Sequence, residues 1–82
     1  MFSKKLYGER LRSLRKASGE SQLLLGTLLS VTRTQISDME SGKRTTTLEK
    51  LVLLCEHYQV SADYLLGLSD EPQNPTIRRD GD

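Results

Sequence analysis

Residues 21–42, SQLLLGTLLSVTRTQISDMESG, decide the fold that this sequence predicts. Their apolar spacing predicts two short helices, Gln22–Leu29 and Arg33–Glu40, separated by a break over residues 30–32. Gly26 lies inside the first helix, where glycine is costly unless the backbone of another helix approaches closely. The rest of the chain is therefore expected to pack around this pair of helices.

Capping residues define both ends of the second helix. Thr32 followed by Gln35 has the T-x-x-Q spacing of a capping box, and Gly42 is suited to stop the helix. With Ile36 at the centre of the buried face, Met39 falls on the same side. The outward positions are polar: Thr34, Ser37, Asp38 and Ser41, with Arg33 projecting from the first turn. This helix therefore offers hydrogen-bonding groups to a partner outside the domain.

Amphipathic helices are also predicted on both sides of this pair. Apolar residues three and four apart indicate one over residues 3–18, which Gly19 ends. Another is predicted over residues 48–58, with an apolar stripe of Leu48, Leu51, Val52, Cys55 and Tyr58. Four leucines exceed what the stripes need, and core packing and a partner surface are equally open for them: Leu23, Leu24, Leu53 and Leu54.

The end of the chain changes in character after a short fifth helix. Ser61 can cap this helix, which is expected to end near Leu66 and Gly67. Residues 69–82 are polar and contain two prolines, which predicts a flexible tail. No stretch alternates polar and apolar residues as a half-buried strand does. The sequence thus predicts an all-α, compact five-helix domain over residues 1–68, followed by the tail.

Charge is divided unevenly along the chain. Residues 1–44 hold nine Lys/Arg against four Asp/Glu, a net charge of +5, whereas residues 45–82 hold three against seven, a net charge of −4. A small domain with one positive half can present that half to a polyanion and turn its acidic side away. The charge pattern therefore favours a nucleic-acid partner.

Several other classes of protein are disfavoured by composition. The single cysteine, Cys55, and the single histidine, His57, are two residues apart, so on a helix they cannot share a metal ion. We therefore expect no metal, no cofactor and no enzymatic activity. The absence of a long apolar run predicts no membrane span, and MFSKKL is not followed by the apolar region of a secretory signal, so a cytoplasmic protein is expected.

Three spaced segments together resemble a known family. They are GERLRSLRKASGESQ, LLGTLLSVTRTQISDMESGKRT and LEKLVLLCEHYQVSADYLLG, and they extend over about residues 7–67. This text resembles the lambda-repressor and Cro-like family of bacterial and phage regulators, also called the xenobiotic-response-element type. The resemblance implies a five-helix DNA-binding domain with a helix-turn-helix formed by its second and third helices.

The resemblance also implies a role for particular residues. Those expected to read base edges are Arg33, Thr34, Ser37 and Asp38. Those expected to contact DNA phosphates are Gln22, Thr32, Lys43, Arg44 and Thr45. Arg15 and Glu40 are expected to form a structural ion pair, and the dimer interface is expected at Tyr64, Leu65, Leu66 and Leu68. Arginine, threonine and aspartate suit guanine, the thymine methyl group and cytosine respectively.

The sequence departs from the family pattern at a few positions. Ser30 replaces the usual glycine of the turn, which strains this residue if its φ is positive. Glu20 replaces a usually apolar residue, and Gln59 stands where glycine is frequent. Polar residues are usual where this chain has Leu23, Leu24 and Leu53, which suggests an additional interface.

Two functional hypotheses follow from these patterns. The first is a sequence-specific transcriptional regulator, acting as a repressor, that binds an inverted-repeat operator in double-stranded DNA as a homodimer. The second is an adaptor or antitoxin-type protein that binds another protein through its surplus leucines. The salt dependence of duplex binding distinguishes them, because contacts to phosphates make affinity fall steeply with salt.

Overall fold

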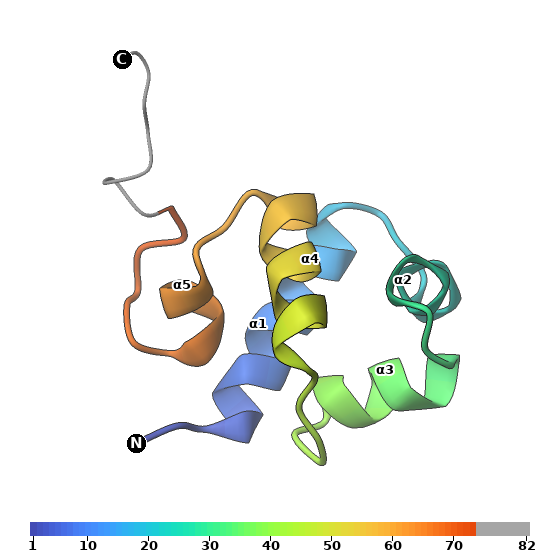
Figure 1. Cartoon of the computed structure of the whole chain (residues 1–82), viewed down its shortest axis with the longest axis horizontal. Helices are drawn as coiled ribbons and strands as arrows, with labels where there is room; N and C mark the ends of the chain where they lie inside the picture. The colour runs from blue at the N-terminus through green and yellow to red at the C-terminus, as the bar shows by residue number, and fades with distance from the viewer. Residues whose placement is uncertain (74–82) are drawn as a thin grey trace.

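Five helices make up the computed structural model, which describes residues 1–73 (Figure 1). The helices are α1 (Lys4–Ala17), α2 (Gln22–Leu29), α3 (Arg33–Glu40), α4 (Leu48–Tyr58) and α5 (Ala62–Leu66). Residues 1–73 contain no strand. The predicted all-α, five-helix architecture is therefore confirmed. No helix within these residues is long and apolar enough to span a bilayer.

The helices enclose a single apolar core. Helix α1 packs against α3 and α5, α2 packs against α3, and α4 packs against α5. In Figure 1, α2 and α3 lie on one side of α4 and α5 lies on the other. Every helix contributes at least one buried side chain: Tyr7, Leu11, Leu25, Leu29, Ile36, Met39, Leu54 and Leu65. Helix α3 thus packs against both α1 and α2.

The buried face of α4 differs from the predicted stripe. Leu48 and Val52 are 80% and 54% exposed, whereas Leu54 is fully buried. Leu51, Cys55 and Tyr58 pack partly buried against the core, as predicted. The inward face therefore centres on Leu54, with neighbours three and four residues away. Leu51 to Cys55 are all apolar, so periodicity alone does not determine which of them points inward.

Close backbone approach explains two glycines inside helices. A Cβ on Gly8 would lie 2.6 Å from the carbonyl oxygen of Glu40, so this glycine lets α1 meet the end of α3. A Cβ on Gly26 would lie 2.8 Å from the carbonyl oxygen of Val31. The close approach predicted at Gly26 is therefore made by the turn after α2 and not by another helix. On α2, Leu25 and Leu29 are buried, whereas Leu28 is 45% exposed.

The packed chain extends beyond the predicted boundary at Leu68. Arg10 donates a hydrogen bond to the carbonyl oxygen of Ser69 at 2.8 Å and pairs with the Asp70 carboxylate at 2.7 Å. The Ser61 amide donates to the carbonyl oxygen of Pro72 at 2.8 Å. The first residues of the predicted tail therefore contact α1 and α5, because their polar groups find partners there. The remainder of that tail, residues 74–82, lies outside the described residues.

Candidate nucleic-acid interface

The orientation of α3 is fixed by its N-terminal cap and its buried face. Thr32 Oγ1 accepts a hydrogen bond from the Gln35 amide at 3.0 Å, and Gln35 Oε1 accepts one from the Thr32 amide at 2.9 Å. The predicted capping box is therefore present. Ile36 and Met39 are at most 2% exposed, so one face of the helix is committed to the core. The opposite face must then point away from the domain.

Polar side chains occupy the outer face of α3. Arg33, Thr34 and Ser37 are exposed, and Asp38 is half-buried. Helical spacing places Arg33 and Ser37 one turn apart, and Thr34 and Asp38 form an adjacent row. These four residues, which the sequence identified as base-reading candidates, therefore lie along the outer side of one short helix.

The ion pair between Arg15 and Glu40 ties α3 to α1. Arg15 Nε donates to Glu40 Oε2 at 2.6 Å, and Arg15 Nη2 donates to Glu40 Oε1 at 3.1 Å. Both residues are only 8% exposed. The hydrogen bond to Glu40 raises the pKa of the Arg15 guanidinium, so Arg15 keeps its positive charge. The end of α3 is therefore fixed by a two-point contact between buried charges.

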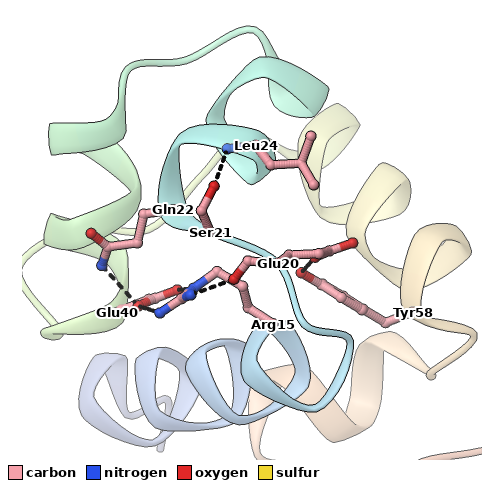
Figure 2. Close-up of polar contacts among 7 residues, drawn as sticks. All are labelled: Arg15, Glu20, Ser21, Gln22, Leu24, Glu40 and Tyr58. Atoms are coloured by element: carbon pink, nitrogen blue, oxygen red, sulfur yellow. Dashed lines mark hydrogen bonds and ion pairs between the residues drawn. The ribbon is translucent and has the colours of Figure 1, made fainter.

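Gln22 extends this buried contact to α2. Its Nε2 donates to Glu40 Oε1 at 3.0 Å, so Glu40 receives hydrogen bonds from α1 and α2 (Figure 2). Ser21 caps α2 by accepting a hydrogen bond from the Leu24 amide at 3.0 Å. The first turn of α2 is thus held at a fixed place relative to the end of α3. Gln22 as a whole is half-buried.

A groove of about 570 Å³ lies between α1, α2 and α3. Its lining includes Gln22 of α2 together with Arg33 and Ser37 of α3, all of which the sequence identified as site candidates. The other lining residues are Arg12, Arg15, Ser21, Leu23, Glu40 and Ser41. Three arginines and one carboxylate in this lining leave it positively charged, which favours an anionic ligand.

The remaining phosphate candidates flank the two ends of α3. Thr32 is the cap residue at its start and is exposed. Lys43, Arg44 and Thr45 follow its end and are exposed as well. The Lys43 amide donates to the carbonyl oxygen of Asp38 at 2.8 Å, which anchors this loop to the helix. None of these four residues lines the groove, so the structure separates them from Gln22 while keeping them next to α3.

The basic residues of α1 have different surroundings. Arg12 lines the groove, where its charge adds to that of Arg33. Arg10 instead donates to the Tyr64 carbonyl oxygen at 2.5 Å and lies over the Tyr64 ring, 4.2 Å from its centroid. Both arginines lie on α1, and helical spacing alone does not distinguish them, because the groove also depends on where α2 lies. Arg12 is therefore an additional candidate at this site.

The predicted dimer interface is corrected at one residue. Leu65 is fully buried in the core, because it is the residue of the short α5 that faces the other helices. Its side chain therefore offers no surface to a partner subunit. Tyr64 and Leu66 are half-buried, and Leu68 is 71% exposed. These three residues remain accessible candidates.

Fold and site together define a class of protein. Helix α3 follows α2 after a short turn, is locked on its inner face and carries polar groups on its outer face, which is the arrangement of a helix-turn-helix. The model of the family described as "Helix-turn-helix" matches residues 11–65. The chain belongs to this family, in its lambda-repressor and Cro-like form.

Relatives in sequence carry the same family description. The uncharacterised HTH-type transcriptional regulator YobD of Bacillus subtilis is 36% identical over 74 residues, which are 90% of this chain and 65% of the relative. The HTH-type transcriptional regulator PrpR of Mycobacterium tuberculosis is 33% identical over 84% of this chain and 14% of its own length. The chain thus spans less than two thirds of the length of these relatives.

Solved structures of similar fold include repressors. The P22 c2 repressor in complex with a synthetic operator has a TM-score of 0.70 and 38% identity over 74% of this chain and 92% of its own. The restriction-modification controller protein C.AhdI of Aeromonas hydrophila has a TM-score of 0.66 and 31% identity over 76% of this chain and 94% of its own. The similarity therefore covers nearly the whole of the two solved chains but leaves about a quarter of this chain unmatched.

Proposed function

We propose that the protein is a sequence-specific DNA-binding repressor that acts as a homodimer on an inverted-repeat operator. One observation carries the proposal: Arg33 and Ser37 of α3 share a positively charged groove with Gln22 of α2. A recognition helix needs base-reading groups beside groups that hold the phosphate backbone, and this groove combines them. The P22 c2 repressor, a structural neighbour that was solved in complex with a synthetic operator, supports the proposal of DNA binding.

Base reading is assigned to the outer face of α3. Arg33 can donate two hydrogen bonds to guanine O6 and N7, and the Thr34 methyl group can contact a thymine methyl group. Ser37 and Asp38 lie one turn further along, where Asp38 can accept from cytosine N4. Asp38 also repels phosphate, which disfavours DNA sequences that do not offer it a donor.

Phosphate contacts are assigned to the groups around α3. The side chains that we assign to phosphate are Gln22, Thr32, Lys43, Arg44 and Thr45. The backbone amides in the first turns of α2 and α3 also favour an anion. Such contacts set the position of the helix on the duplex but carry no sequence information. They are expected to supply most of the salt-dependent part of the affinity.

The homodimer follows from the small size of the reading surface. The 8-residue α3 reaches few base pairs, whereas two copies related by a two-fold axis read two half-sites about 34 Å apart. Leu68, which is 71% exposed, and the half-buried Tyr64 and Leu66 are the apolar groups that we assign to this contact. Their position next to one another in the chain makes a compact self-complementary patch feasible.

A protein-binding adaptor remains the second candidate, because one observation favours it. Leu23 and Leu24 at the start of α2 are 64% and 55% exposed, and Leu53 on α4 is 45% exposed. Exposed leucines of this kind are typical of contact surfaces between proteins. An adaptor of this type would not need the polar face of α3. Substitutions on that face should therefore leave the activity of an adaptor unchanged, whereas they should weaken the DNA binding of a repressor.

Two substitutions test the proposed division of labour. Arg33→Ala should weaken operator binding by about 1–3 kcal/mol and relax the preference at one base position in each half-site. Lys43→Ala should weaken all duplexes similarly and lower the slope of log affinity against log salt by about 1. Fluorescence anisotropy over a salt series, with operator and scrambled duplexes, measures both effects.

Lys50→Ala is the matched control, because Lys50 lies on α4 outside both sets of residues. It should change neither the base preference nor the salt slope. Wild-type protein that binds no duplex at low salt would contradict the proposal and favour the adaptor. An unchanged base preference in Arg33→Ala would remove Arg33 from the reading set.

A further inference from the structure

Glu20, in the loop between α1 and α2, joins this loop to the end of α4. Its carboxylate accepts a hydrogen bond from Tyr58 Oη at 2.6 Å and contacts His57 Nε2 at 2.5 Å. The Glu20 side chain is only 12% exposed. Burial and the hydrogen bond to Glu20 raise the pKa of the Tyr58 phenol, so Tyr58 stays a proton donor at neutral pH.

The same residue also contacts the arginine that holds α3. Arg15 Nη1 donates to the carbonyl oxygen of Glu20 at 2.7 Å, while Nε and Nη2 of this arginine hold Glu40. Figure 2 shows the Arg15 side chain between Glu40 and Glu20, with Tyr58 beyond Glu20. Glu40 also accepts from Gln22, which lines the groove. Tyr58 is therefore linked to the groove through Glu20, which uses its carboxylate for Tyr58 and its backbone carbonyl oxygen for Arg15.

This chain of contacts constrains where Gln22 can lie. Glu20 and Gln22 are separated by one residue, so fixing the loop at Glu20 restricts the start of α2 directly. The guanidinium of Arg15 is a rigid planar fork, so holding one nitrogen on the loop orients the others towards Glu40. An apolar residue at position 20 could fill the space but could not accept the hydrogen bond from Tyr58.

We propose that Glu20 is a positioning residue for DNA binding, which acts by holding Arg15, Glu40 and Gln22 in the arrangement that grips a phosphate. Tyr58 and His57 are its supports on α4. This inference rests on the proposed DNA-binding function and adds a contribution from α4, which carries none of the residues assigned to DNA contact. It predicts that a hydroxyl on α4 is energetically coupled to an amide on α2.

A double-mutant cycle in operator affinity tests the coupling. Tyr58→Phe and Gln22→Ala are measured singly and together by fluorescence anisotropy, at a temperature where circular dichroism shows every variant folded. Tyr58→Phe should weaken operator binding about 3- to 10-fold, and the combined loss should differ from the product of the single losses by at least about 3-fold. Losses that multiply independently would overturn the proposal, because a merely structural hydroxyl is not coupled to Gln22.

Tyr7→Phe is the matched control. It also removes a phenol hydroxyl, in this case from a buried side chain, but within residues 1–73 the hydrogen bond of this hydroxyl goes to the Met39 sulfur, at 3.8 Å. Tyr7→Phe should leave the effect of Gln22→Ala unchanged. Glu20→Gln keeps an acceptor for Tyr58 and should retain affinity within about 3-fold of the wild type, whereas Glu20→Leu should not. Equal losses in both Glu20 variants would count against the proposal.

A measurement without DNA separates this inference from the proposed function. Nuclear magnetic resonance of the free protein follows the Gln22 side-chain amide, whose protons are held by Glu40. Its resonances should shift in Tyr58→Phe and Glu20→Leu and stay in place in Tyr7→Phe. If the Gln22 resonances stay in place in all three variants, the proposed positioning role of Glu20 is refuted, even if the protein binds its operator. If they shift but wild-type protein binds no duplex, the proposed function fails instead.

Discussion

Two arginines of α1 show how differently the two sides of the domain are stabilised. On the side of α3, Arg15 pairs with Glu40 at 2.6 Å, and the side chains are 9% and 4% exposed. On the side of α5, Arg10 pairs with Asp70 at 2.7 Å, but the Asp70 side chain is 99% exposed. The distances are nearly equal, so burial of the carboxylate decides what each contact contributes.

The comparison assigns different tasks to the two sides. The α3 side holds a buried polar assembly, in which each charge depends on its partner because water cannot replace it. The α5 side relies on apolar packing, on Arg10 contacts to backbone carbonyl oxygens, and on a surface ion pair. We infer that the α3 side is geometrically strict, as a reading surface must be, whereas the α5 side tolerates change.

Neutralising the two carboxylates gives the largest expected difference. Glu40→Gln leaves the buried Arg15 charge without its partner and should lower the free energy of unfolding by about 3–5 kcal/mol. Asp70→Asn should not shift the unfolding midpoint measurably, because position 70 is in water and Arg10 keeps its hydrogen bonds to the carbonyl oxygens of Tyr64 and Ser69. Urea unfolding followed by circular dichroism measures both. Similar losses in the two variants would refute the contrast between the two sides.

The leucines of α4 give the next largest effect. Leu54→Ala removes a fully buried side chain and should cost about 2–5 kcal/mol of unfolding free energy, whereas Leu53→Ala should stay within about 0.5 kcal/mol of the wild type. The same denaturant experiment applies to both. A larger loss in Leu53→Ala would show that the inward face of α4 centres on Leu53 and not on Leu54, or that a second subunit covers Leu53.

The smallest effects are expected at two strained helix ends, one on each side of the domain. Ser30 after α2 and Gln59 after α4 have φ values of 58° and 57°, where a side chain is unfavourable. Ser30→Gly should raise the free energy of unfolding by about 0.5–1 kcal/mol. Gln59→Gly should gain less, because it also removes a hydrogen bond from Gln59 Nε2 to the Glu56 carbonyl oxygen at 2.7 Å. Thermal unfolding resolves this ranking, and a loss of stability in Ser30→Gly would contradict it.

Local signals made the α3 side predictable from the sequence. The capping box at Thr32 and Gln35, the stop at Gly42 and the inward faces of Ile36 and Met39 each depend on residues a few positions apart. The family pattern, which has glycine at position 30, predicts strain at Ser30 if its φ is positive, and the φ of 58° meets this condition. The positions of the candidate reading residues on α3 follow from these signals.

Contacts between distant parts of the chain could not be predicted. The inward face of α4 is ambiguous in a run of apolar residues, and Arg10 finds Asp70 sixty residues later. In the sequence, Glu20 stands out only as a departure from the family pattern, because its hydrogen bond from Tyr58 depends on how α4 lies against the loop between α1 and α2. Such contacts depend on how helices are placed in space, which helical periodicity does not specify.

Selection of bound duplexes from a random pool by the wild-type protein tests the central claim most directly. If α3 reads bases in a homodimer, the recovered sequences should form an inverted repeat whose half-sites lie about 34 Å apart. The same selection with Arg33→Ala should lose information at one position of each half-site. A pool that shows no enrichment at low salt, or an enriched sequence that Arg33→Ala selects unchanged, would contradict the account.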